Sequence, residues 1–136
     1  MRSNLKLGKI AGIPIGLHYT WFIIFVLVTL SLARIFFPNG YPGWGTAVYW
    51  AMGIGTSLVF FGCVVVHELA HSLVARKFGV PVKDITLFLF GGVASITRDA
   101  KQPVQELLMS LAGPMSSIGL AGLFALLGFA VQDASE

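Results

Sequence analysis

The chain has 136 residues, of which 56% are hydrophobic and only 11% are charged, with a formal net charge of +3. A soluble domain is about one quarter charged and a disordered chain is poor in apolar residues, so the composition excludes both classes. The nine basic residues form no dense patch along the chain, which argues against nucleic acid as a partner. The composition therefore predicts a membrane protein.

Three apolar stretches are long enough to cross a bilayer, whose hydrocarbon core requires about 20 residues of helix. We expect an all-α membrane protein with transmembrane helices at about 14–36, 47–75 and 107–131. The first stretch carries no Lys, Arg, Asp or Glu between Ile10 and Ala33. The third is rich in Gly, Ala and Ser, which favours close packing between helices in lipid.

Basic residues flank these stretches unevenly. Those before the first stretch and those between the second and third are Arg2, Lys6, Lys9, Arg76, Lys77, Lys83, Arg98 and Lys101. The connector after the first stretch offers only Arg34. By the positive-inside rule, we expect a multi-pass protein of the cell membrane with its N-terminus and the 76–106 loop in the cytoplasm.

Within that loop, residues 82–97 contain two β-prone runs joined by Gly91-Gly92. Two such runs separated by a Gly-Gly pair predict a small β-hairpin. An amphipathic or re-entrant segment at the membrane surface is the alternative.

The second stretch ends in the sequence His67-Glu68-Leu69-Ala70-His71. Positions i and i+4 of a helix lie on one face about 6 Å apart along the axis, so both imidazoles can bind one zinc ion. Glu68 lies at the margin of this face, where it can take a proton from a metal-bound water. Ionisable side chains are costly inside a membrane helix, so this cluster indicates function. The alternative is that the helix ends near His67 and the three side chains are solvated.

Two further motifs follow in order, Phe90-Gly-Gly-Val-Ala and Ala112-Gly-Pro114. Together with the His-Glu-x-x-His motif, they resemble the site-2 protease family of intramembrane zinc metalloproteases. The opening Gly12-Ile-Pro-Ile-Gly-Leu-His-Tyr-Thr-Trp21 is similar to the bacterial branch related to the sporulation factor protease.

The resemblance implies a zinc-dependent metalloendopeptidase that cleaves transmembrane segments near the cytoplasmic face, in regulated intramembrane proteolysis. It implies one Zn²⁺ ion held by His67 and His71, with Glu68 as the catalytic base. It also implies that Gly91 and Gly92 border the opening of the site, where an unwound substrate can pair with a strand edge. The expected partners are a transmembrane protein substrate and the lipid bilayer, with no nucleic acid and no particular oligomeric state.

The family takes a third zinc ligand from an Asp in a Leu-Asp-Gly motif, which this sequence lacks. Its other acidic residues lie outside the apolar stretches or at the external end of the third: Asp84, Asp99, Glu106, Asp133 and Glu136. Cys63 lies one turn before His67, but a set that also included His71 would span about 12 Å. We therefore expect residues 1–136 to be the N-terminal part of one metalloprotease domain. The third ligand, the remaining helices and any C-terminal CBS domain would lie outside this chain.

Two other functions compete with this interpretation. A catalytically incomplete membrane module of the same fold, with a binding or regulatory role, is favoured by the missing third ligand. A metal transporter would need polar residues continued along several spans and is disfavoured. His18 is predicted to lie at the membrane interface rather than to bind metal, and Gly113-Pro114 to permit a kink or a tight helix contact.

Overall fold

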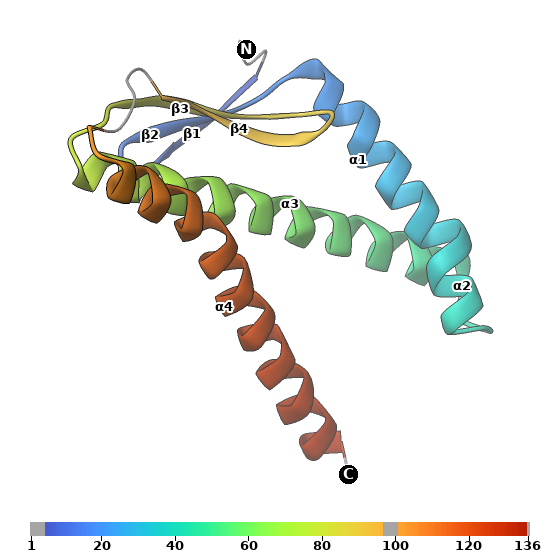
Figure 1. Ribbon diagram of the computed structural model, residues 1–136. Coiled ribbons are helices and arrows are strands. Elements are labelled where there is room, and N and C mark those ends of the chain that lie inside the picture. Colours follow the sequence, from blue (N-terminus) through green and yellow to red (C-terminus); the bar gives the residue numbers. More distant parts are fainter. Residues whose placement is uncertain (1–4, 97–100, 136) are drawn as a thin grey trace.

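The computed structural model describes residues 5–96 and 101–135. A small sheet lies over one end of a long helix, and two other helical segments extend away from it (Figure 1). In chain order the elements are β1 (Leu5–Ile10), β2 (Ile13–Leu17), α1 (Tyr19–Ser31), the π-helical turn η1 (Leu32–Phe36), α2 (Phe37–Gly40), α3 (Thr46–Lys77), β3 (Val82–Phe88), β4 (Gly91–Ile96) and α4 (Pro103–Ser135). Four residues that the sequence analysis mentions lie outside the described residues: Arg2, Arg98, Asp99 and Glu136.

Three helical stretches are long and apolar enough to cross a membrane, which confirms the expected number. They are Tyr19–Gly40, made of α1, η1 and α2, Thr46–Lys77 and Pro103–Ser135. The second agrees with the expected bounds to within two residues, and the third begins and ends about four residues further out. The chain thus has the arrangement of helices expected of a multi-pass membrane protein.

The expected start of the first helix at residue 14 was wrong. Residues Ile13, Ile15 and Leu17 are buried at 2%, 3% and 4% exposure and belong to strand β2, where alternate side chains share a face. The helix begins only after His18, whose ring accepts a hydrogen bond from the Thr20 N–H at 3.4 Å. This capping bond satisfies one of the free N–H groups at the start of a helix.

The sheet has the strand order β1-β2-β3-β4. Strands β3 and β4 form the predicted antiparallel hairpin, while β1 and β2 form a second hairpin that was not expected. The parallel pairing of β2 with β3, with Ile15 opposite Ile85, joins the two hairpins. The expected Gly-Gly turn was wrong, because Gly91 and Gly92 begin β4 and residues 89–90 make the connection.

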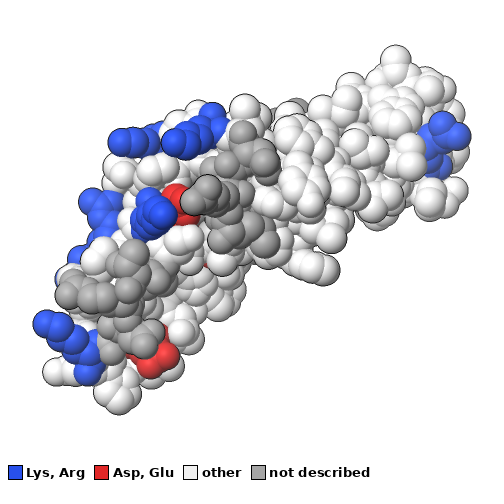
Figure 2. Space-filling model, turned by 90° about the horizontal axis from the view of Figure 1, so that it is seen from above, with Lys and Arg blue, Asp and Glu red and all other residues white. Residues whose placement is uncertain are grey.

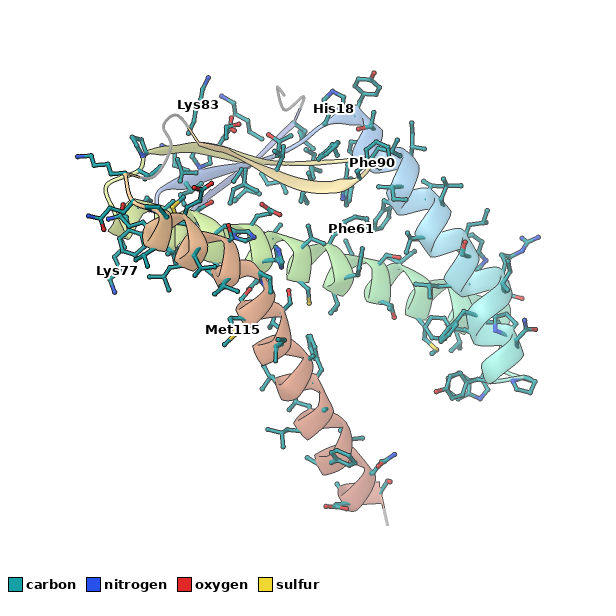
Figure 3. All side chains as sticks on the ribbon, viewed as in Figure 1. His18, Phe61, Lys77, Lys83, Phe90 and Met115 are labelled. Atoms are coloured by element: carbon teal, nitrogen blue, oxygen red, sulfur yellow. The ribbon has the colours of Figure 1, made fainter. Side chains whose placement is uncertain are left out.

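The sheet packs on α3 through one face of that helix. Phe61 and Leu69 are buried at 4% and 9% exposure, and Phe61 lies between α3 and the sheet (Figure 3). Around them, two apolar clusters join the sheet to the helix: Ile13, Ile15, Leu69 and Ile85 in one, and Leu17, Trp21, Phe61 and Leu87 in the other. Each fully buried side chain of this size contributes about 1.5–3 kcal/mol, so the sheet is firmly fixed to α3.

A second face of α3 packs against α1. Thr29 donates a buried hydrogen bond to Ser57 at 2.9 Å. At Gly53 an added Cβ would lie 3.1 Å from the Thr29 carbonyl oxygen, so the two backbones approach closely there. The third face of α3, which carries the histidines, meets only the first part of α4 before the two helices diverge (Figure 1). Helix α3 is therefore the element on which sheet, α1 and α4 are all positioned.

Candidate functional site

The structure brings His67 and His71 together on α3. Their Nε2 atoms are 3.2 Å apart, and the ring planes are inclined by 76° with centroids 4.8 Å apart. Two nitrogens bound to one tetrahedral zinc ion at 2.0–2.1 Å each are separated by about 3.3 Å. The two rings therefore already have the spacing that a shared zinc ion requires.

Helix α4 supplies a hydrogen-bond partner for the other nitrogen of each ring. His67 Nδ1 lies 2.8 Å from Ser117 Oγ, and His71 Nδ1 contacts the Met109 carbonyl oxygen. A carbonyl can only accept, so His71 Nδ1 carries the proton and its Nε2 presents a lone pair. Histidines that bind metals are commonly held in this way by a group behind the ring.

Gly113 lies on α4 between these two contacts and is buried against both rings. A Cβ at this position would lie 2.6 Å from His67 Nε2 and closer still to His71 Nε2. The tight helix contact predicted for Gly113-Pro114 is therefore confirmed. Because glycine has no side chain, both Nε2 atoms can approach α4 at this point, and a pair of imidazole nitrogens at this separation fits a metal ion as two of its ligands.

A cavity of about 380 Å³ lies beside the histidines, between α3, α4 and the start of β4. Its lining residues are Phe60, Cys63, Val64, His67, Glu68, Phe90, Gly91, Gly92 and Ser117. Gly92 approaches Glu68 so closely that an added Cβ would lie 2.9 Å from Glu68 Cγ. The structure thus places Gly91 and Gly92 next to the carboxylate that the sequence singled out as a base.

The remaining ligand candidates do not complete a metal site, although Cys63 lines the cavity beside the histidines. Within residues 5–96 and 101–135, no group of three or more His, Cys, Asp or Glu side chains is arranged to hold a metal ion. His18 lies at the start of α1, apart from α3 (Figure 3), and its Nδ1 is 2.8 Å from Thr20 Oγ1. The two histidines of α3 therefore provide two ligands and not a complete set.

Sequence reasoning did not identify Ser117 or the Met109 carbonyl as partners of the histidines. The available signal was spacing, because Met109, Gly113 and Ser117 are four residues apart and share one helix face. That face matches the i, i+4 spacing of His67 and His71 on α3. Nothing in the sequence, however, specifies which face of α4 packs against which face of α3.

Residues 55–134, more than half of the chain, match the family profile described as "Peptidase family M50". The chain belongs to this family. The matched region includes both histidines of α3, their hydrogen-bond partners on α4 and the β3–β4 hairpin. M50 is a family of metallopeptidases, which agrees with the protease interpretation drawn from the ordered motifs.

Two relatives match this chain over more of its length than the M50 profile does. The chain is 43% identical over 124 residues to sll0528, a candidate zinc metalloprotease of Synechocystis sp., covering 88% of this chain and 31% of the relative. It is 39% identical over 127 residues to Rip3, a candidate zinc metalloprotease of Mycobacterium tuberculosis, covering 93% of this chain and 32% of the relative. This M50 chain thus spans about a third of the length of the curated relatives that it matches.

A solved structure agrees with the M50 assignment. The site-2 protease from Methanocaldococcus jannaschii superposes with a TM-score of 0.59 at 36% identity, covering 82% of this chain and 45% of that one. The resemblance to the site-2 proteases, first inferred from three motifs, is therefore confirmed at the level of both family and fold.

Proposed function

We propose that this chain carries the zinc-binding and proton-transferring part of an intramembrane endopeptidase that cleaves transmembrane protein segments. The observation that carries the proposal is the 3.2 Å separation of the His67 and His71 Nε2 atoms, with each ring held from behind by α4. Two imidazole Nε2 atoms this close together on an apolar helix have the separation of two ligands of one zinc ion. The third ligand is proposed to come from a segment outside this chain. The match covers only about a third of each relative, so about two thirds of their length lies outside it.

The proposed chemistry is the hydrolysis of a peptide bond. Bound zinc supplies a Lewis acid that lowers the pKa of water to about 7 and polarises a carbonyl. Glu68, one residue after His67 and lining the same cavity, accepts the proton of the attacking water on its carboxylate and then donates it to the amine leaving group. His67 and His71 stay neutral and hold their Nε2 lone pairs toward the site.

For the substrate, we propose that an unwound segment pairs with β4. This strand is at the edge of the described sheet and pairs with β3 alone, so its other side presents unpaired N–H and C=O groups. Gly91 and Gly92 place that edge within reach of Glu68. Strand addition fixes a substrate by main-chain hydrogen bonds, which do not require a particular substrate side chain.

The site is proposed to face the cytoplasmic side of the cell membrane. Lys and Arg side chains gather over the sheet end of the molecule (Figure 2), while Arg34 lies in η1 at the other end. The parallel pairing of β2 with β3 requires the N-terminal segment and the loop after α3 to lie on the same side. Both segments are basic, so the positive-inside rule places that side in the cytoplasm.

Zinc binding by the purified chain tests the metal site. We expect the detergent-solubilised chain to bind zinc in competition with a chromophoric chelator, and the double variant H67A/H71A to lose this binding. His18→Ala, which removes the histidine outside the site, is the matched control and should bind as the unsubstituted chain does. Equal zinc binding by H67A/H71A and the unsubstituted chain would contradict the proposed site, whereas zinc bound only by the complete protein would show that the ligand from outside this chain is required.

Labelling of single cysteines tests the orientation. In a Cys63→Ser background, Asn39→Cys and Lys83→Cys each place one thiol at an exposed position on opposite ends of the molecule. On intact cells, a membrane-impermeant maleimide should label Asn39→Cys at least about ten times more than Lys83→Cys, because only the former lies outside. Permeabilised cells should label both, and the reverse pattern on intact cells would overturn the proposed orientation.

A further inference from the structure

The histidine pair packs against one face of α4, on which three residues make chemically different contacts with the two rings. These residues are four positions apart in the sequence. Met109 provides a carbonyl oxygen, Gly113 allows close approach because it has no side chain, and Ser117 provides a hydroxyl. His71 is bonded to the first of these and His67 to the last, while Gly113 lies between them. The two rings are therefore held by chemically unlike partners.

The difference matters for the protonation of the rings. The Met109 carbonyl can only accept, so it fixes His71 with its proton on Nδ1 and a lone pair on Nε2. A hydroxyl can both donate and accept, so Ser117 suits either neutral form of His67. When no cation is bound, His67 can keep its proton on Nε2 and donate it across the 3.2 Å to His71 Nε2.

Metal binding requires the other form of His67, with the proton on Nδ1 and the lone pair on Nε2. In that form Ser117 Oγ, 2.8 Å away, accepts the hydrogen bond from Nδ1, so the same partner holds the ring before and after the change. A fixed acceptor at this place would set two lone pairs against each other in the metal-free site. A fixed donor would oppose metal binding.

We propose that Ser117 is a positioning residue, whose hydroxyl holds the His67 ring in the orientation and protonation form that binds the metal. This inference rests on the proposed zinc site. It concerns the hydroxyl alone, because Ser117 otherwise lies exposed on α4 and is not buried among packed side chains. Ser116 provides a comparison on the same helix turn, since its hydroxyl donates a hydrogen bond to the Gly113 carbonyl oxygen at 2.7 Å instead of contacting a histidine.

The experiment compares zinc affinity of the detergent-purified chain with that of three variants, by competition with a chromophoric chelator. Ser117→Ala should weaken zinc binding by about 10- to 100-fold, the usual effect of removing a partner behind a metal-binding histidine. Ser117→Thr, which keeps a hydroxyl at this position, and Ser116→Ala should bind zinc with an affinity within about threefold of that of the unsubstituted chain. Unchanged affinity in Ser117→Ala, or equal losses in Ser117→Ala and Ser116→Ala, would overturn the inference.

Nitrogen NMR of the metal-free chain gives a second measurement that needs no zinc. The chain has three histidines, so ¹⁵N-labelled rings are readily resolved. Ser117→Ala should shift the ring nitrogens of His67 and leave those of His18 in place, and unchanged His67 signals would overturn the contact. If the unsubstituted chain binds no zinc, the affinity comparison is made in the complete protein, where absence of zinc would refute the proposed metal site, while these spectra still decide whether Ser117 holds the ring.

Discussion

Replacing Glu68 by Gln in the complete protein is expected to lower the rate of substrate cleavage by about 10²- to 10⁴-fold, the usual contribution of a general base. Gln has nearly the same shape as Glu but cannot accept a proton at neutral pH. Because Glu68 is not one of the two nitrogen ligands, zinc binding should stay within about threefold of the unsubstituted protein. The expected result is therefore a protein that binds zinc normally but cleaves its substrate very slowly.

Cleavage of a membrane-spanning substrate in proteoliposomes, measured beside zinc content, checks this prediction. Glu106→Gln is the matched control, because Glu106 is exposed in the first turn of α4 and does not line the cavity around Glu68. That variant should cleave at the normal rate. A Glu68→Gln protein that cleaves normally would refute Glu68 as the base, and one that also loses zinc would show a role in binding instead.

Adding one methyl group at Gly113 should abolish the metal site. In Gly113→Ala the new Cβ would lie 2.6 Å from His67 Nε2 and closer to His71 Nε2, distances that packed atoms do not adopt. Either the rings turn away and lose the shared direction of their lone pairs, or α4 moves away and the contacts of Ser117 and Met109 are lost. Both responses weaken zinc binding, by on the order of 100-fold or more.

Gly122→Ala is the control for this substitution. It makes the same change on the same helix, at a position where an added Cβ meets nothing within 4 Å. Alanine is the better helix former by about 0.8–1.0 kcal/mol, so this control should bind zinc normally and unfold no more easily. Normal zinc binding in Gly113→Ala would show that α4 does not pack against the histidines in the way described.

The three spans and the histidine pair could be predicted because each depends on local sequence. Length and hydropathy suffice for a span, and the i, i+4 spacing suffices to bring His67 and His71 together. The strand β2 was missed because Ile10 to Ala33 has no Lys, Arg, Asp or Glu, so the hydropathy of the segment predicted a helix that included it. Its alternation of Ile13, Ile15 and Leu17 was the signal for a strand.

The α4 side of the site could not be predicted in the same way. Ser117 and the Met109 carbonyl reach the histidines only because α4 packs on α3 at one particular rotation and depth. Helix contacts in lipid depend on small residues and van der Waals fit, and α4 is rich in small residues along most of its length. Several faces of α4 were therefore compatible with the sequence, and the structure selects one.

The pairing of β2 with β3 also sets an order of events during synthesis. Ile15 lies opposite Ile85, and between them the chain must cross the bilayer through α1 and return through α3. The ladder between the two hairpins can close only when the second crossing is complete, and such long-range pairings form slowly. Until then the four-stranded sheet beside Glu68 is incomplete, so a nascent chain can have both histidines in the membrane before the sheet packs on α3.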